Sequence, residues 1–289
     1  MPLRNFLGLV KFSHTIFALP FALLGFFLAS QDGAGPLDVR TLLLVVGCMV
    51  FARSAAMAFN RWLDRRIDAR NPRTAVREIP AGVISSRAAL VFVAANSLLF
   101  VGCTALLNPL CLALSPVALL VILGYSYTKR FTYLCHFVLG LGLALAPVGA
   151  YLAVTAQWAP LPLVYGLVVL LWVSGFDIIY ALQDEAFDRS ESLYSIPVRL
   201  GTQRALRLGR LLHVLCGLAL VGALYLQCRS YPESRWLTLG AGLAFLGLLV
   251  YQHTLVRPGD LSRVNLAFFT TNGVASVLFG AVSILDFYW

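Results

Sequence analysis

Three oxygen-bearing side chains stand at regular spacing directly after an early apolar run. Asn60, Asp64 and Asp68 follow the run 42–59 at positions i, i+4 and i+8, so a helix places them on one face. Carboxylates at a membrane helix end are costly and face a cavity or a partner. Oxygen ligands of this kind bind Mg²⁺ together with phosphate oxygens. The spacing therefore predicts a metal and phosphate site at this helix end.

A second acidic set ends a later apolar run. Asp177, Asp184 and Asp188 are spaced i, i+7 and i+11, again one helical face, with Tyr180 beside it. Two such sets that face each other would hold Mg²⁺ ions and bind a diphosphate between them. The alternative is that these acids are solvated loop edges. That interpretation suits Glu185 but not Asp177, which follows a long apolar run and is expected below the surface.

A phenol and several cations lie close to these acids in the sequence. Tyr125 and Lys129 end another apolar run four residues apart, which places both on one helical face. Arg73 and Arg77 lie in the polar stretch after the first acidic set, where they would close over phosphate oxygens. We therefore predict that Arg73 and Arg77 contact the phosphate groups of a substrate, and that Tyr125 and Lys129 lie together near the acids.

One arginine, Arg53, lies inside an apolar run. It stands seven residues before Asn60, on the same helical face. An arginine inside a membrane is costly unless it faces a cavity or an anion. We predict that Arg53 binds substrate, and the alternative is an ion pair with a buried acid such as Asp177.

The composition indicates that membrane helices position these residues. The chain has 289 residues, of which 60% are hydrophobic and 12% are charged. A soluble domain has about half apolar and about a quarter charged residues. The net charge is +9, but the charges lie between apolar runs, so they favour a role in membrane topology over nucleic-acid binding. The six cysteines form no CxxC pair and are predicted to be small apolar residues.

Nine apolar runs approach the ~20 residues that a spanning helix needs. The runs are 12–29, 39–59, 87–107, 109–127, 134–155, 159–183, 204–228, 236–256 and 264–287. We therefore expect an all-α polytopic membrane protein with nine helices around a central cavity that opens to the cytoplasmic side. We expect one domain, 1–289, with polar cap loops at about 61–86 and 185–203. The first run lacks a convincing cleavage site, which favours a retained helix over a signal peptide.

The basic residues divide unequally between the two sides of this predicted bundle. Eighteen lysines and arginines lie in alternate loops and three in the opposite loops. Because positive charge is retained on the cytoplasmic side, the N-terminus is predicted to be cytoplasmic and the C-terminus outside. Both acidic sets then reach the cytoplasmic side, which is consistent with one shared site.

Together, the spaced sets resemble the UbiA-type superfamily of intramembrane aromatic prenyltransferases. The resemblance rests on Asn60-x3-Asp64-x3-Asp68, Asn71-Pro72-Arg73-Thr74-x2-Arg77, Tyr125-x3-Lys129 and Asp177-x2-Tyr180-x3-Asp184-x3-Asp188. It covers essentially the whole chain. Many members carry a further acid after the first asparagine, where this chain has Arg61, but the i, i+4, i+8 set is intact.

The resemblance implies a mechanism and a role for each set. Two Mg²⁺ would bridge the diphosphate of a polyprenyl donor, with Asp177 as a further ligand or as an anchor for one. The implied ligands are Asn60, Asp64, Asp68, Asp184 and Asp188. Lys129, Tyr125 and Arg77 would contact the diphosphate directly. Neutralising the leaving group promotes ionisation to an allylic cation, which a ring carbon of a phenolic acceptor attacks before losing a proton. The isoprenoid tail would lie between helices, open to lipid.

The acceptor is less defined than the donor. The segment 11–20 resembles the 4-hydroxybenzoate polyprenyltransferase subgroup, whose relatives act on a dihydroxynaphthoate in menaquinone synthesis. The resemblance thus implies ubiquinone or menaquinone biosynthesis in a bacterial inner membrane, with 4-hydroxybenzoate or 1,4-dihydroxy-6-naphthoate as acceptor. Both carry a carboxylate that Arg53 would hold. His14 would orient the acceptor or take up its proton, or else serve as a polar packing residue.

Two other classes of function remain open. A secondary transporter also combines many spans with buried acids, but its sites lie near the bilayer midplane, at interrupted helices. Here the acids stand at helix ends and precede basic loops. A membrane scaffold without catalysis offers no reason for two metal-like clusters. Haem farnesylation and chlorophyll prenylation use the same machinery, but no residue indicates a tetrapyrrole site.

Overall fold

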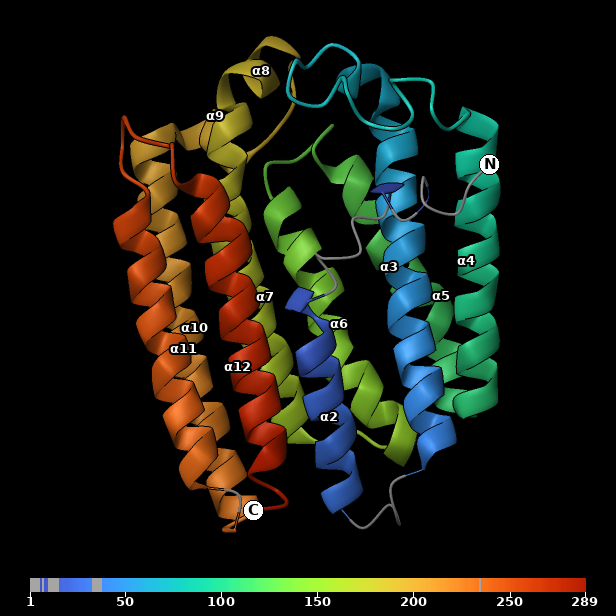
Figure 1. The fold of residues 1–289 in the computed structure, drawn as a ribbon, viewed down its shortest axis with the longest axis vertical. Helices are drawn as coiled ribbons and strands as arrows, with labels where there is room; N and C mark the ends of the chain where they lie inside the picture. The colour runs from blue at the N-terminus through green and yellow to red at the C-terminus, as the bar shows by residue number, and fades with distance from the viewer. Residues whose placement is uncertain (1–5, 7, 10–15, 33–37, 234) are drawn as a thin grey trace.

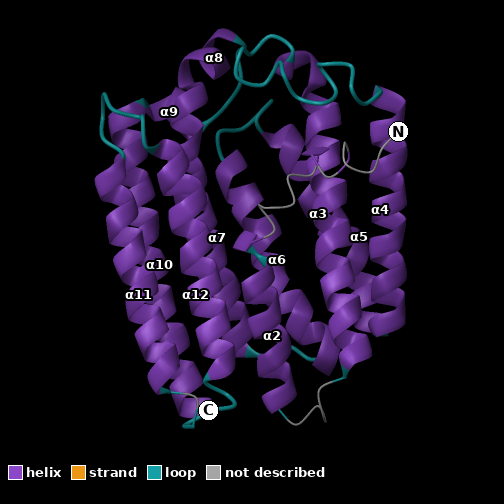
Figure 2. Cartoon of the chain, viewed as in Figure 1, coloured by secondary structure: helices purple, strands orange, loops and turns teal. Residues whose placement is uncertain are grey.

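Helices account for the regular structure of the chain. A computed structural model describes residues 6, 8, 9, 16–32, 38–233 and 235–289. Within these residues the secondary structure is helical apart from one isolated β-bridge between Arg257 and Asp260 (Figure 2). His14 lies outside the described residues.

Each predicted apolar run that is fully described corresponds to a helix. The long helices are α3 (Val39–Asp68), α4 (Ser86–Leu107), α5 (Pro109–Thr128), α6 (Cys135–Thr155), α7 (Pro160–Ala181), α10 (Thr202–Ser230) and α11 (Trp236–Leu255). The last run forms a π-helix, η3 (Leu266–Thr271), that continues into α12 (Asn272–Leu285). Eight helices among the described residues are long and apolar enough to cross a membrane. The chain is therefore an integral membrane protein.

The first run is the exception. Its helix, α2 (Leu19–Gln31), has 13 residues, fewer than the roughly 17–25 of a spanning helix. Residues 12–15 of the predicted run lie outside the described part of the chain. The predicted count of nine spans thus becomes eight long helices and one shorter apolar helix within the described residues.

The bundle carries its polar connections at one end. Residues 69–85 and 182–201, which we call the cap, lie together at the top of Figure 1. The second segment contains a 3₁₀ turn (Leu182–Asp184) and the short helices α8 (Glu185–Ser190) and α9 (Ile196–Leu200). An ion pair of 2.6 Å between Arg70 and Glu191 joins the two cap segments. The loops 129–134 and 256–265 lie at the same end, so the predicted basic loops gather there.

Helix α3 explains why an acidic set reaches the cap. It has 30 residues, or about 45 Å at 1.5 Å per residue, and the hydrocarbon core is only ~30 Å thick. The prediction that a loop begins at residue 61 is therefore wrong, because α3 continues to Asp68. Asp38 starts this helix by accepting hydrogen bonds from the backbone N–H groups of Arg40 and Thr41.

Helix α7 lies at the centre of the packing. Trp172 is fully buried; its Nε1 donates to Asn272 Oδ1 at 2.9 Å, and its ring packs against Phe21 and Phe245. One tryptophan thereby ties α7 to α12, α2 and α11. Gly140 of α6 permits close approach to α7, since a Cβ there would lie 2.5 Å from Ser174 Oγ. Small residues permit such close helix packing in membranes.

Candidate active site

Asp64, near the end of α3, is the most buried acid of the site. It is 1% exposed, and its two oxygens pair with Lys129 Nζ at 2.6 Å and Arg130 Nη2 at 2.9 Å. Asn60 Nδ2 lies 3.4 Å from both Asp64 Oδ2 and Ser126 Oγ. The first acidic set therefore faces the end of α5, where the predicted Lys129 stands.

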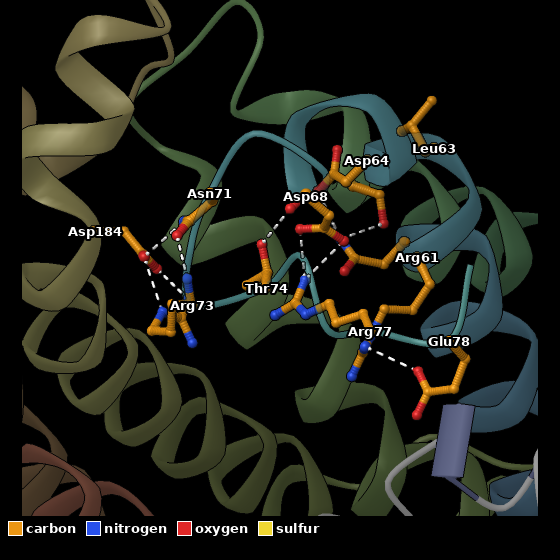
Figure 3. A network of polar contacts seen from close by, with 12 residues as sticks. Arg61, Leu63, Asp64, Asp68, Asn71, Arg73, Thr74, Arg77, Glu78 and Asp184 are labelled. Atoms are coloured by element: carbon orange, nitrogen blue, oxygen red, sulfur yellow. Dashed lines mark hydrogen bonds and ion pairs between the residues drawn. The ribbon is translucent and has the colours of Figure 1, made fainter. Parts of the chain in front are cut away.

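Asp68 is bound by the cap loop that follows it. Arg77 Nη1 lies 2.8 and 2.9 Å from the two carboxylate oxygens of Asp68. Thr74 Oγ1 donates to the backbone carbonyl of Asp68 at 3.1 Å, which folds the loop back onto the helix end. Figure 3 shows Arg77 between Asp68 and the neighbouring pair of Arg61 and Glu78.

The same loop reaches the second acidic set. Arg73 Nε donates to Asp184 Oδ1 at 3.0 Å, and Asn71 Nδ2 donates to the same oxygen at 3.2 Å (Figure 3). Arg73 Nη1 also donates to the hydroxyl of Tyr180 at 3.3 Å. Burial alone would lower the pKa of the Arg73 guanidinium, but the hydrogen bonds and charge of Asp184 outweigh it and raise that pKa above its usual value. The loop thus connects the two sets, which lie more than a hundred residues apart in the chain.

Asp184 and Asp188 do not continue α7 as one uninterrupted α-helix. The α-helix ends at Ala181, the 3₁₀ turn carries Asp184, and α8 carries Asp188. The charges of Lys129 and Asp184 both act on Asp188, so this carboxyl lies near the first acidic set as well as its own. The prediction that both sets meet at one end of the bundle is confirmed. The prediction that Asp177, Asp184 and Asp188 share one face of a single helix is wrong, because the α-helix is interrupted between them.

Asp177, in the last turns of α7, has an unexpected partner. Its Oδ2 lies 2.7 Å from Nδ1 of His136, in the first turn of α6. The alternative prediction of an ion pair between Arg53 and Asp177 is wrong, because the carboxylate of Asp177 pairs with His136 instead. Arg53 Nε is buried without a hydrogen-bond partner among the described residues. Tyr125 is its electrostatic neighbour and is also within range of Asp177.

Sequence and fold are both similar to proteins of one family. Residues 18–274 match the UbiA prenyltransferase family. The chain is 31% identical over 250 residues to the 4-hydroxybenzoate octaprenyltransferase of Aliivibrio salmonicida, covering 85% of this chain and 84% of that protein. The protein of the same name from Aeromonas hydrophila is 33% identical over 251 residues, covering 86% and 84%. This chain belongs to the UbiA prenyltransferase family.

Solved UbiA structures share the arrangement of helices. The apo structure of a UbiA homologue from Aeropyrum pernix K1 has a TM-score of 0.83 and 32% identity, covering 94% of this chain and 98% of that one. A UbiA homologue from Archaeoglobus fulgidus, bound to GPP and Mg²⁺, has a TM-score of 0.75. Because its sequence identity to this chain is only 17%, this similarity is evidence of a shared fold and of nothing more. The predicted family and fold class are confirmed.

The departure at Arg61 from the UbiA motif has a structural reason. Arg61 is 3% exposed, and its Nη1 pairs with Glu78 Oε2 in the cap loop at 3.2 Å. The position after the first asparagine is therefore used here to hold the cap against α3. The acids at Asp64 and Asp68 keep their own partners, so the i, i+4, i+8 set is undisturbed.

Four residues of this UbiA-family site were given no role from the sequence. They are Asn71, Ser126, Arg130 and His136. Arg130 adjoins Lys129, and Asn71 begins the turn that carries Arg73, so both had a positional signal. His136 stood at the start of an apolar run without any spacing that related it to Asp177. Long-range contacts of this kind leave no local pattern.

The donor set of the site fits Mg²⁺ that arrives together with phosphate. Carboxylate and amide oxygens are the ligands that this hard cation prefers. No three His, Cys, Asp or Glu side chains of the described residues form a preformed metal cage. Mg²⁺ is held in proteins through one or two carboxylates plus substrate phosphates, so a cage is not required. The acids of the site are instead balanced by arginine and lysine.

Proposed function

We propose that this UbiA-family protein transfers a polyprenyl group from polyprenyl diphosphate to the ring of an aromatic acid of the 4-hydroxybenzoate type. One observation carries the proposal. Acids of α3 and of the segment after α7 meet at the cap end and alternate there with lysine and arginine. Such a set offers oxygen ligands to a metal and cationic donors to a diphosphate at the same place.

The basic residues bind and neutralise the diphosphate. Lys129, Arg77 and Arg73 now pair with Asp64, Asp68 and Asp184. On donor binding each cation exchanges its carboxylate for a phosphate oxygen and so stabilises the charge that develops on the leaving group. Tyr125 and Tyr180 complete the donor side as phenol contacts.

The acids released by this exchange become available to metal. Asn60, Asp64, Asp68, Asp184 and Asp188 would hold two Mg²⁺, with Asp177 as a further ligand or anchor. The bound metal supplies additional neutralisation of the diphosphate, which favours its departure from the allylic carbon. The residues themselves keep the two carboxylate sets on opposite sides of the donor.

The acceptor is expected below the diphosphate. Arg53 lies two helical turns below Asn60 on α3 and has a buried Nε without a partner among the described residues. A buried guanidinium group of this kind is stabilised by a carboxylate. The relatives named 4-hydroxybenzoate octaprenyltransferase support 4-hydroxybenzoate, and 1,4-dihydroxy-6-naphthoate is the alternative acceptor with the same carboxylate. A transporter is less well supported, because the acids gather at the cap end.

We also infer one transferase domain, 1–289, with its cavity and cap on the cytoplasmic side of a bacterial inner membrane. The basic loops at the cap end support this orientation. The N-terminus is then cytoplasmic and the C-terminus outside. The isoprenoid tail of the donor lies among the helices, in contact with membrane lipid.

The first test is an assay in membranes that contain the protein. Polyprenyl diphosphate is supplied with and without Mg²⁺, and 4-hydroxybenzoate and 1,4-dihydroxy-6-naphthoate are offered separately, with products identified by mass. We expect Mg²⁺-dependent prenylation of one acceptor. Diphosphate release without prenylation would support the donor half and refute both acceptors. Folded protein that turns over no donor at all would refute the transferase assignment.

A further inference from the structure

A buried histidine links Asp177 of α7 to the cap. His136 lies in the first turn of α6, and its side chain is 4% exposed. One ring nitrogen, Nδ1, lies 2.7 Å from Oδ2 of Asp177 on α7. The other, Nε2, lies 3.3 Å from the backbone nitrogen of Ile196, the first residue of cap helix α9. The ring is therefore held from both sides.

These two contacts assign the proton on the ring. A backbone N–H can only donate, so Nε2 of His136 accepts from Ile196. Nδ1 is then the nitrogen that donates a hydrogen bond to Asp177. Ser174 Oγ donates to the backbone carbonyl of His136 at 3.3 Å and further restrains this turn of α6 against α7.

This pairing distinguishes Asp177 from the other acids. Asp64, Asp68 and Asp184 each pair with a lysine or an arginine. Among the described residues, Asp177 has no lysine or arginine partner and contacts the His136 ring instead. The Asp177 side chain is 21% exposed, and only its Oδ2 is engaged by His136. Its other oxygen is thus available to a ligand.

We propose that His136 is a positioning residue that orients the Asp177 carboxylate toward the aromatic acceptor and couples this orientation to the seating of the cap. The proposal rests on the proposed function, because it concerns the acceptor half of that site, and it takes Asp177 as an acceptor contact and not as the further Mg²⁺ ligand. Tyr125 is an electrostatic neighbour of both Arg53 and Asp177, so we place the acceptor near these three residues. Arg53 binds the carboxylate of the acceptor there, and Asp177 accepts a hydrogen bond from its hydroxyl. Such a bond increases the electron density of the ring that attacks the allylic carbon.

The role requires hydrogen bonding but no proton uptake by the ring. His136→Gln and His136→Asn keep a neutral donor and acceptor, whereas His136→Leu keeps the volume and loses both. His213→Leu is a matched control, because His213 is also buried but contacts His253 and the Trp172 carbonyl instead of an acid. Initial rates are measured with acceptor varied at saturating polyprenyl diphosphate, and then the reverse. Thermal unfolding of each purified variant shows whether it is folded.

We expect His136→Leu to lose about 10- to 100-fold in kcat/KM for the acceptor, the effect of one lost hydrogen bond to a charged group. The KM for polyprenyl diphosphate should stay within about twofold of wild type. At least one amide variant should recover activity to within about fivefold. His213→Leu should change the unfolding temperature but not the balance between acceptor and donor KM.

Three outcomes would overturn this role. If His136→Leu keeps wild-type kinetics, His136 has no positioning function. If both amide variants are folded and as slow as His136→Leu, the ring carries a proton instead. If donor and acceptor KM change together, the effect is on general structure. If His136→Leu does not fold, the same comparison of acceptor KM with donor KM is made for His136→Gln and His136→Asn. A wild-type enzyme that prenylates no aromatic acid would instead refute the proposed function itself.

Discussion

At the scale of single residues, the acids of the site differ in their partners. Asp64 is bound by two cations, Asp68 and Asp184 by one arginine each, and Asp177 by the His136 ring. A buried carboxylate with a cationic partner stays charged. The proposed metal ligands on α3 and after α7 are therefore kept in the charged form that binds a cation.

Removing one acid from either set tests this arrangement. We expect Asp64→Ala and Asp184→Ala each to lower prenyl transfer by at least about 100-fold, because a metal ligand is lost and its basic partner is left uncompensated. Membrane insertion should be unchanged. Turnover in washed membranes, normalised to the amount of inserted protein, measures the effect. Asp38→Ala is a matched control, since Asp38 caps the opposite end of the same helix. Near-normal turnover in either site variant would contradict the two-set arrangement.

The buried guanidinium of Arg53 is expected to affect binding of the acceptor. Arg53→Gln should raise the KM for the aromatic acid by about 10- to 100-fold, because the acceptor carboxylate loses a charged partner. The KM for polyprenyl diphosphate should not change, since Arg53 lies two turns below the metal ligands of α3. Steady-state kinetics with each substrate varied separately would measure both values. An equal rise in the two KM values would contradict acceptor binding by Arg53.

At the scale of elements, the segment 69–85 holds the site together. It carries the arginines that reach Asp68 on α3 and Asp184 beyond α7. Its position depends on the ion pair between Arg61 and Glu78, whose side chains are 4% and 23% exposed. Because both ends of this pair are largely shielded from water, leaving either charge alone costs more than removing both.

A double-mutant cycle on this pair tests how the cap is held. Arg61→Gln should destabilise the protein by about 3 kcal/mol and lower activity, because Glu78 remains without a partner and the loop loosens. The double variant with Glu78→Gln should be more stable than the sum of the single changes predicts, by about 1 kcal/mol. Thermal unfolding in detergent measures each corner of the cycle. Strict additivity would mean that the pair does not hold the loop.

At the scale of the whole molecule, the side of the membrane that the cap faces decides where the chain ends. The C-terminus lies at the end of the bundle opposite the cap (Figure 1). A cytoplasmic cap therefore places the C-terminus outside, whether or not the 13-residue α2 crosses the membrane. A C-terminal alkaline phosphatase fusion should then be active and a fluorescent protein fusion dark. The opposite pair of results would mean that the cap faces the outside of the membrane.

Patterns within short stretches of the chain were enough to locate the helices and to bring both acidic sets to one end. Hydropathy and residue spacing are local properties, and a membrane forces each apolar run into a helix whose faces follow the 3.6-residue period. The same patterns also led to the family. The partners of the acids followed from the tertiary structure alone. The contacts of Arg73 with Asp184, of His136 with Asp177 and of Arg61 with Glu78 depend on which helices and loops are neighbours. The isolation of Arg53 Nε among the described residues is decided in the same way, because it depends on which side chains the neighbouring helices bring to α3.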